Sequence, residues 1–185
     1  MVRFPIPVRR IAAHLARGGL IAYPTESCYG LGCDPRNRNA VQSLLKLKQR
    51  PQRKGLILIA SKYAQLSHYL QPLSPAEQAT LQNDGAQAIT YLMPAKSGCP
   101  LWLRGGHNTL AVRVTAHREA AALCRALNMA LVSTSANRGG GRPARTWADC
   151  RRRFGRKALV LPGRVGRRKK PTTIRVWADG RIVRE

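Results

Sequence analysis

Apolar and polar positions follow one another along this chain in two patterns, one typical of amphipathic helices and one typical of buried strands. Residues 8–17 place Val8, Ile11 and Leu15 on one face of a helix, which the pair Gly18-Gly19 is expected to end. Residues 56–60 are instead a continuous apolar run, as in a strand covered on both faces. Segments of both kinds succeed one another, so the sequence predicts an α/β protein.

The same patterns place the other elements. Helices are expected at residues 8–17, 39–47, 61–70, from 75 onward, 117–127 and 147–154, and strands at residues 20–23, 56–60, 88–93, 110–114, 130–133, 158–161, 172–177 and 181–183. Asn39 is the expected N-cap of the second helix, and SPAE at residues 74–77 is a capping box. Asp179-Gly180 indicates a hairpin between the last two strands, and residues 96–108 are expected to form a glycine-rich loop. Strands and helices largely alternate, so we expect a mixed sheet with helices packed on it.

Five cations crowd the connection between the second helix and the strand at residues 56–60: Lys46, Lys48, Arg50, Arg53 and Lys54. Pro51 disfavours helical geometry at the residue before it, so the helix is expected to end there. A fixed bend rich in positive charge is suited to holding a phosphate or a carboxylate. A solvated basic turn explains the same residues, so this stretch alone decides nothing.

Three stretches are polar where packing alone would not require it, at residues 23–30, 48–54 and 133–137. The first is rich in small, polar and glycine residues, which indicates that something approaches its backbone closely. The last reads Ser-Thr-Ser-Ala-Asn, a composition that a hydroxyl-rich turn or helix cap would also explain. Because ligands of open α/β sheets bind beyond strand ends, we expect the three stretches to meet around one pocket.

Length and composition set limits on this picture. The chain has 185 residues, of which 44% are apolar, which is enough for one ordinary core and predicts a single domain over residues 1–185. No apolar run approaches the roughly 20 residues that a membrane-spanning helix needs, and the N-terminus lacks an apolar signal region. We therefore expect a soluble, cytoplasmic protein.

The charge balance points to polyanionic partners. The chain has 33 Lys and Arg against 8 Asp and Glu, a net charge of +25, and its last 48 residues hold 16 of those cations and 3 of those anions. Such an excess raises both the association rate and the non-specific affinity for nucleic acid. Charge alone does not separate an enzyme that contacts RNA from a plain RNA-binding protein.

The expected pocket offers few groups for acid–base or metal chemistry. Glu26 is the only carboxylate near the three polar stretches, so neither a catalytic carboxylate pair nor an acidic metal cage is supported. The five cysteines contain no C-x-x-C pair, which favours free buried thiols over structural zinc. His107 and His117 have no triad partner in view. A site of cations, hydroxyls and amides suits reactions in which the protein positions anionic reactants and neutralises their charge.

Four short sequences resemble motifs of one family. YPTESCYGLG at residues 23–32 is similar to the Y-P-T-E-T-x-Y-G-L-G signature of the YrdC/TsaC family, the L-threonylcarbamoyladenylate synthases. KQRP at residues 48–51 resembles its K-x-R-P, LAVRV at 110–114 its V-A-V-R-V strand, and STSAN at 133–137 its S-x-S-A-N. The motifs keep the family's order and spacing across nearly the whole chain, and the length is similar to that of the short TsaC form.

This resemblance implies a YrdC-like fold, a twisted mixed open sheet with flanking helices around a basic cavity. It also implies a nucleotidyltransferase reaction in which L-threonine, bicarbonate or CO2, and ATP give L-threonylcarbamoyladenylate and diphosphate. That reaction is the first step of the t6A modification at position 37 of tRNA. Mg2+ is expected to come with ATP, because the site has few carboxylates to hold it. The implied partners are tRNA or double-stranded RNA and other proteins of the t6A pathway.

The resemblance also assigns roles to residues. Lys48, Arg50, Ser135 and Asn137 correspond to the family's K-x-R/S-x-N set, the two cations on ATP phosphates and the other two on nucleotide or intermediate. Lys54, Arg113, Ser133 and Thr172 are further candidates for ATP, and Thr25 and Arg113 are candidates for threonine. Arg113 could hold a carboxylate or phosphate bidentately, although an arginine on a strand can equally be an edge residue.

The chain departs from the family's pattern at residues 85–88, where GAQA stands in place of W-P-G-P. The alternative to catalysis is a non-catalytic protein on the same fold, binding tRNA or double-stranded RNA or assisting ribosome assembly, which the net charge of +25 would serve. Release of diphosphate that requires threonine and bicarbonate distinguishes the two.

Overall fold

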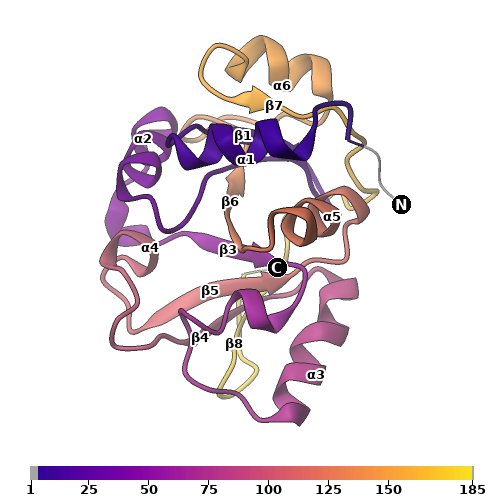
Figure 1. Cartoon of the computed structure of the whole chain (residues 1–185). Coiled ribbons are helices and arrows are strands. Elements are labelled where there is room, and N and C mark those ends of the chain that lie inside the picture. The colour runs from indigo at the N-terminus through magenta and orange to yellow at the C-terminus, as the bar shows by residue number, and fades with distance from the viewer. Residues whose placement is uncertain (1–3, 185) are drawn as a thin grey trace.

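A computed structural model of the chain describes residues 4–184, which build one nine-stranded sheet (Figure 1). The strands are β1 (Ile21–Pro24), β2 (Tyr29–Gly32), β3 (Ile57–Ala60), β4 (Thr90–Pro94), β5 (Thr109–Val114), β6 (Leu131–Ser135), β7 (Leu159–Val160), β8 (Ile174–Val176) and β9 (Ile182–Arg184). Their order across the sheet is β7-β1-β2-β6-β3-β5-β4-β8-β9.

The sheet is mixed in direction. Strand β3 runs parallel to β5 and antiparallel to β6, while β1 pairs antiparallel with β2 and parallel with β7. Strand β4 pairs antiparallel with β5 and parallel with β8, and β8 forms the expected antiparallel hairpin with β9. The predicted fold class, a twisted mixed α/β sheet with flanking helices, is thereby confirmed.

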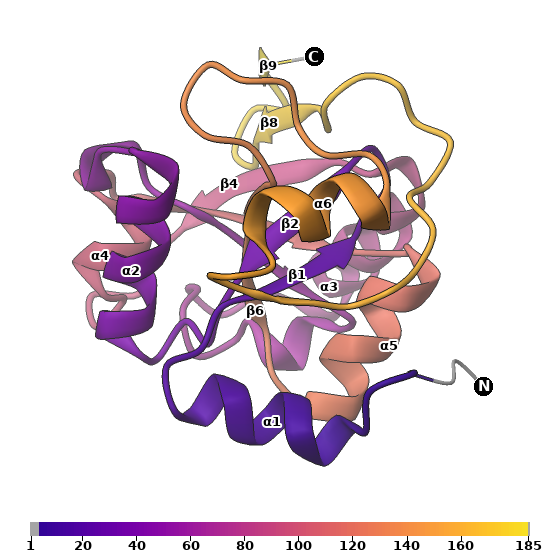
Figure 2. The same cartoon turned by 90° about the horizontal axis from the view of Figure 1, so that it is seen from above.

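The helices lie on both sides of this sheet (Figures 1 and 2). They are α1 (Val8–Ala16), α2 (Arg38–Lys48), α3 (Pro75–Asn83), α4 (Leu101–Arg104), α5 (Arg118–Leu127) and α6 (Trp147–Phe154), with 3-10 turns η1 (Gln52–Lys54), η2 (Tyr63–Gln65) and η3 (Asp84–Gln87). In the part of the chain that the structure describes, no helix combines the length and the apolarity that crossing a bilayer would take.

Neighbouring residues of the central strands divide the core between two faces. Leu58 of β3 and Val132 of β6 belong to the larger cluster, which includes the inner sides of α2, α3, α4 and α6. Ile59 and Leu131, the adjacent residues, belong to the smaller cluster with α1 and α5. Side chains of a strand point alternately to its two faces, so a run that is apolar throughout fills both.

Strand β2 was not predicted, because its sequence Tyr-Gly-Leu-Gly has the composition of a loop. The structure explains both glycines by close approach. A Cβ atom at Gly32 would lie 2.2 Å from the backbone oxygen of Val132, and one at Gly30 would lie 3.2 Å from Cγ2 of Thr25. The two glycines therefore let β2 fit between its neighbouring strands. The close approach to this backbone that the sequence predicted is made partly by other residues of the protein, Val132 and Thr25.

Three local predictions are wrong. Residues 61–70 form only η2 and turns, because the Gln65 side chain accepts the Ser61 N–H at 2.8 Å and donates to the Cys124 backbone oxygen at 2.8 Å, so tertiary contacts override helix propensity. The predicted loop at residues 96–108 contains α4. Helix α2 is capped by Asn37, whose side chain accepts the Ala40 N–H at 3.0 Å, and not by Asn39.

Candidate active site

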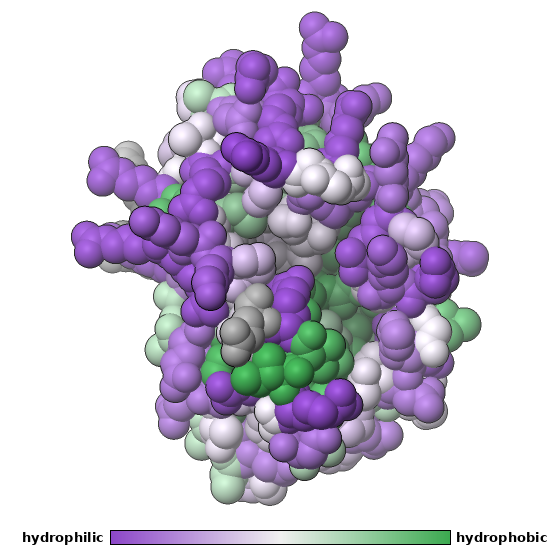
Figure 3. All heavy atoms as spheres, turned by 180° about the vertical axis from the view of Figure 1, so that it is seen from behind, coloured by the Kyte–Doolittle hydropathy of each residue, from purple (hydrophilic) through white to green (hydrophobic). Residues whose placement is uncertain are grey.

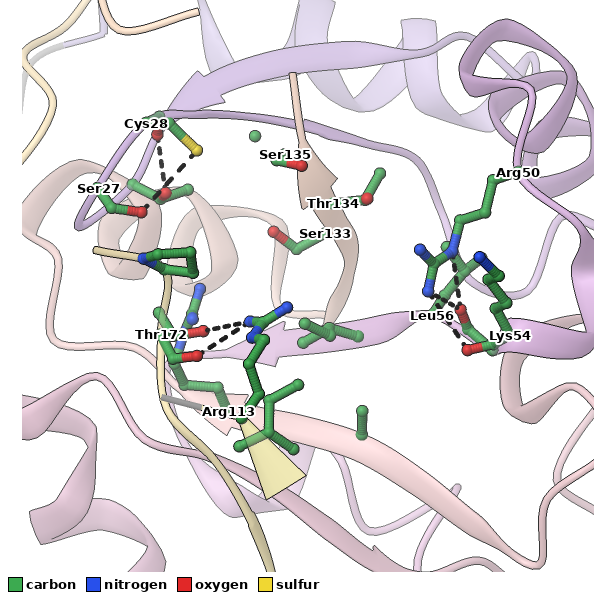
Figure 4. A pocket seen from close by; sticks show the side chains of 18 of the residues that line it. Ser27, Cys28, Arg50, Lys54, Leu56, Arg113, Ser133, Thr134, Ser135 and Thr172 are labelled. Carbon is green, nitrogen blue, oxygen red and sulfur yellow. Dashed lines mark hydrogen bonds between the residues drawn. The ribbon is translucent and has the colours of Figure 1, made fainter. Parts of the chain in front are cut away.

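A cavity of about 670 Å³ lies where the three polar stretches come together. Its walls include residues of the β1–β2 turn, the α2–β3 connection, β5, β6 and the C-terminal segment. Figure 4 shows Arg113 and Thr172 towards one end, Arg50 and Lys54 at the other, and the hydroxyl residues of β6 between them. Sites for small molecules commonly have volumes of about 300–1,000 Å³, so the cavity has the size of a ligand site.

The structure brings most of the predicted site residues to this cavity. The lining includes Thr25 from the first stretch, Arg50 and Lys54 from the second, Ser133, Ser135 and Asn137 from the third, and Arg113 and Thr172. The α2–β3 connection is therefore one wall of a cavity as well as a basic turn. The turn at residues 85–88, where the chain lacks W-P-G-P, does not contribute to the described lining.

Lys48 is the predicted residue that the structure places elsewhere. It is 5% exposed and does not line the cavity; its ammonium lies behind the β6 terminus. There Nζ donates to the backbone oxygens of Ser135 and Asn137, the latter at 2.8 Å. Burial and the nearby Arg50 guanidinium lower the pKa of Lys48 to about 8, although Cys28 acts in the opposite direction. The expectation that Lys48 contacts ATP phosphates directly does not match this geometry.

Arg50 does face the cavity, and the backbone around it fixes its side chain. Gln49 ends α2 in the left-handed conformation with φ of 53°. The Arg50 guanidinium donates to the Gly55 backbone oxygen from Nη2 at 2.9 Å and from Nε at 3.2 Å. Burial lowers its pKa, but a guanidinium remains charged throughout the physiological range. Arg50 is thus a fixed cation with further donors that can face a ligand.

The end of β6 carries a closed set of hydrogen bonds. Ser135 Oγ donates to Asn137 Oδ1 at 2.6 Å, and Asn137 Nδ2 donates to the backbone oxygens of Arg138 at 3.0 Å and Gly141 at 2.8 Å. Because Asn137 is held by the loop that follows it, the Ser135 hydroxyl bonded to it is held as well, and both residues line the cavity beside Ser133.

Arg113 is the most buried cation of the cavity wall. Strand β5 lies between β3 and β4, so Arg113 is in the middle of the sheet and is not an edge residue. Arg113 is 4% exposed, and its Nη2 lies 3.2 Å from Glu26 Oε2. The Thr25 hydroxyl donates to the Cys28 backbone oxygen at 2.8 Å and closes a tight β1–β2 turn.

Several lining residues were not among the predicted site residues. They include Arg104, Arg145, Lys169 and Arg184, together with His107, for which no triad partner was in view, and Ser27 and Cys28 of the first stretch. Arg184 of β9 donates to the Thr172 backbone oxygen at 2.9 Å, and burial, Arg113 and Arg50 together lower its pKa. Nothing local marks Arg184, because it reaches the cavity only through the pairing of the last two strands.

The donors present here do not form a metal site of the protein's own. Within residues 4–184, no three His, Cys, Asp or Glu side chains come close enough to share an ion. The five cysteines are all buried and free, as predicted.

Comparisons with known proteins agree with this geometry. Residues 13–185 match the family Sua5_yciO_yrdC, described as "Telomere recombination". The chain is 53% identical over 172 residues to "Threonylcarbamoyl-AMP synthase" of Thiobacillus denitrificans, covering 93% of this chain and 92% of that one. It is also 53% identical over 182 residues to the protein of that name in Halorhodospira halophila, covering 97% and 95%.

A solved structure supports the same relationship. A doubly substituted Sua5 of P. abyssi superposes with a TM-score of 0.82 at 26% identity, over 95% of this chain and 51% of that one. The present chain thus spans about half the length of that Sua5, whereas it spans nearly all of the curated relatives above. Sequence, fold and cavity together place the chain in the Sua5/YciO/YrdC family.

Proposed function

We propose that this chain is a threonylcarbamoyl-AMP synthase. It condenses L-threonine, bicarbonate or CO2, and ATP to L-threonylcarbamoyladenylate and diphosphate, with release of water when bicarbonate is the carbon source, and this is the first step of t6A formation in tRNA. The observation that carries the proposal is identity of 53% over nearly the full length of synthases of that name. The cavity supports it, because its lining includes several cations and hydroxyls and its volume leaves room for a nucleotide beside a small amino acid.

The charge distribution fits the difficult step. Threonine carbamate, formed from the threonine amine and CO2 or bicarbonate, is an anion whose carbamate oxygen attacks the α-phosphorus of another anion, ATP, so electrostatic repulsion opposes their approach. Arg50 and Lys54 at one end and Arg113 and Arg184 at the other end neutralise that charge in a partly enclosed site. The protein needs no nucleophile of its own, since its task is to align the two reactants and to stabilise the departing diphosphate.

We assign individual roles from the family resemblance together with position in the cavity. Arg50, Lys54, Ser135 and Asn137 bind the triphosphate and the sugar side of ATP, with Ser133 and Thr172 as further hydroxyl contacts. Thr25 and Arg113 bind threonine, the arginine through the substrate carboxylate. Mg2+ enters bound to ATP, because the nearest carboxylate, Glu26, is already engaged by Arg113 and Thr115.

A direct product search tests the proposal. The purified chain is incubated with ATP, Mg2+, threonine and bicarbonate, and threonylcarbamoyl-AMP is sought by mass spectrometry. We expect a product that disappears when threonine or bicarbonate is left out, with diphosphate in equal amount. Absence of the adduct at every Mg2+ concentration would favour the alternative, a non-catalytic protein binding tRNA or double-stranded RNA or assisting ribosome assembly.

We further propose that tRNA or double-stranded RNA binds the basic surface, with other proteins of the t6A pathway as partners and the cytoplasm as the place of action. Figure 3 shows hydrophilic side chains crowding the upper part and both flanks of the face opposite that in Figure 1.

Exposed cations of α6 and the C-terminal segment include Arg151, Arg152, Arg167, Lys169 and Lys170. Arg153 and Arg168, in contrast, hold the fold by bonds to Arg142 and Gln87 backbone oxygens. Replacing Arg151, Arg152, Arg167 and Lys170 with glutamine is expected to flatten the salt dependence of RNA binding.

A further inference from the structure

Glu26 is a buried carboxylate to which the proposed reaction assigns no direct role. It lies in the β1–β2 turn directly after Thr25, yet it is not part of the described lining of the cavity. Its side chain is 12% exposed. Burying a carboxylate costs free energy unless the charge is paired, so the groups that pair with Glu26 determine its role.

Those partners lie on strand β5 and just beyond it. Thr115 Oγ1 donates to Glu26 Oε1 at 2.6 Å, and Arg113 Nη2 lies 3.2 Å from Glu26 Oε2. Burial by itself would raise the pKa of the Glu26 carboxyl, but Arg113 and Thr115, with His117 and a backbone N–H, outweigh it and the pKa is lowered. Glu26 is therefore ionised at neutral pH and forms an ion pair with Arg113, in which Oε2 interacts by charge and proximity and, among the described residues, accepts no hydrogen bond.

The pair leaves the other side of the Arg113 guanidinium unused. Among the described residues, Arg113 Nε has no hydrogen-bond partner, and Nη1 reaches only Thr90 Oγ1 at 3.5 Å. Arg113 lines the cavity, whereas Glu26 lies outside the lining. A guanidinium held from one side by a carboxylate can present its remaining N–H groups to a second carboxylate in a fixed orientation.

We propose that Glu26 is a positioning residue for the amino-acid substrate, which it orients by holding Arg113 so that the free N–H groups meet the threonine carboxylate. The inference rests on the proposed function, because it takes threonine as the ligand of that end of the cavity. Glu26 does not touch the substrate; it fixes the group that does. Its backbone oxygen also accepts the Arg168 N–H at 3.2 Å, which fixes the turn that carries it.

Kinetics and equilibrium binding of four variants test the inference. Glu26→Gln keeps an acceptor for Thr115 but removes the charge, Thr115→Val removes the hydroxyl without changing the volume much, and Arg113→Met removes the guanidinium. The fourth is the double variant Glu26→Gln/Arg113→Met. Glu119→Gln is the matched control, since Glu119 is a half-buried carboxylate that pairs with His117 and is absent from the described lining.

Glu26→Gln is expected to raise the threonine KM and Kd about tenfold, while kcat and the ATP KM stay within about threefold. Thr115→Val is expected to raise the threonine KM about threefold, and Glu119→Gln to leave it unchanged. In the Arg113→Met background, Glu26→Gln is expected to change the threonine Kd less than about twofold, because its effect passes through the arginine. Threonine Kd is measured by titration calorimetry with a non-hydrolysable ATP analogue, so inactive variants remain informative.

Two results would overturn the inference. One is an equal loss of ATP and threonine affinity in Glu26→Gln, which indicates a general structural role. The other is an effect of Glu26→Gln that persists at full size without Arg113. Failure of the proposed function is a different observation, since it would appear as absence of threonylcarbamoyl-AMP with the wild-type chain.

Discussion

The Lys48 ammonium donates to the Asn137 backbone oxygen at 2.8 Å and lies 3.4 Å from its side-chain oxygen. A second connection joins the same two segments, since the Gly139 N–H donates to the Lys48 backbone oxygen at 3.1 Å. Lys48 therefore fixes the loop after β6 to the end of α2 from beneath the cavity. Three members of the K-x-R/S-x-N set, Arg50, Ser135 and Asn137, reach the lining on elements that Lys48 holds together.

Replacing Lys48 should therefore disturb the site without removing a ligand contact. Lys48→Met keeps the aliphatic stem but leaves the Ser135 and Asn137 oxygens without their donor. We expect a loss of about 1–3 kcal/mol in the free energy of unfolding and at least a tenfold loss of kcat/KM for ATP. Urea denaturation and diphosphate release measure the two effects. Lys46→Met, an exposed change in the same helical turn, should alter neither.

The lowered pKa of Lys48 gives a pH-dependent signature. The folded-state pKa of Lys48 is about 8, against the ordinary lysine value of 10.5, so between these values the unfolded chain binds more protons than the folded chain. The free energy of unfolding of the wild type, relative to Lys48→Met, should thus rise from pH 8 to pH 10.5 and stay constant below pH 8. Denaturation of both proteins at several pH values measures this difference. If the difference in unfolding free energy between the wild type and Lys48→Met did not change from pH 8 to pH 10.5, the burial of the Lys48 ammonium would be contradicted.

Arg50 should behave differently, because it lines the cavity. Arg50→Lys keeps the positive charge but loses the planar guanidinium. That group donates to the Gly55 backbone oxygen and at the same time has further N–H groups that can face a ligand. We expect kcat/KM for ATP to fall about 100-fold and the threonine Kd to change little, with the ATP effect measured at saturating threonine. Arg53→Lys, an exposed change in the same connection, is the control. Equal losses in both variants would mean that the connection acts only through general charge.

The sequence was sufficient for the elements with strong periodic or capping signals, and insufficient where distant contacts decide. The capping box at Ser74 forms as expected, and the buried strand at residues 56–60 becomes β3. Strand β2 was missed because its two glycines, which allow close packing against neighbouring strands, give the segment the composition of a loop. Arg184 and Glu26 show the same limit within the site, since Arg184 enters the cavity through strand pairing and Glu26 gains its partner from β5. A local pattern identifies residues of suitable chemistry, but it does not show which of them face the ligand.

The C-terminal segment provides a prediction about shape. The Gly166 N–H donates to the Thr25 backbone oxygen at 2.9 Å, and a Cβ at Gly166 would lie 2.6 Å from the Glu26 backbone oxygen. Gly166→Ala must therefore push this segment away from the β1–β2 turn. The same segment continues to Lys169 and Thr172 in the cavity wall, so the displacement reaches the site.

We expect Gly166→Ala to cost about 1–3 kcal/mol of stability and to weaken threonine binding, because Thr25 loses the contact that holds its backbone. Gly98→Ala is the matched control, since a Cβ there meets nothing within 4 Å. Thermal denaturation and threonine calorimetry on both variants separate a local clash from a general effect of removing glycine. Similar threonine Kd values for Gly166→Ala and Gly98→Ala would show that the segment packs on the turn without shaping the threonine site.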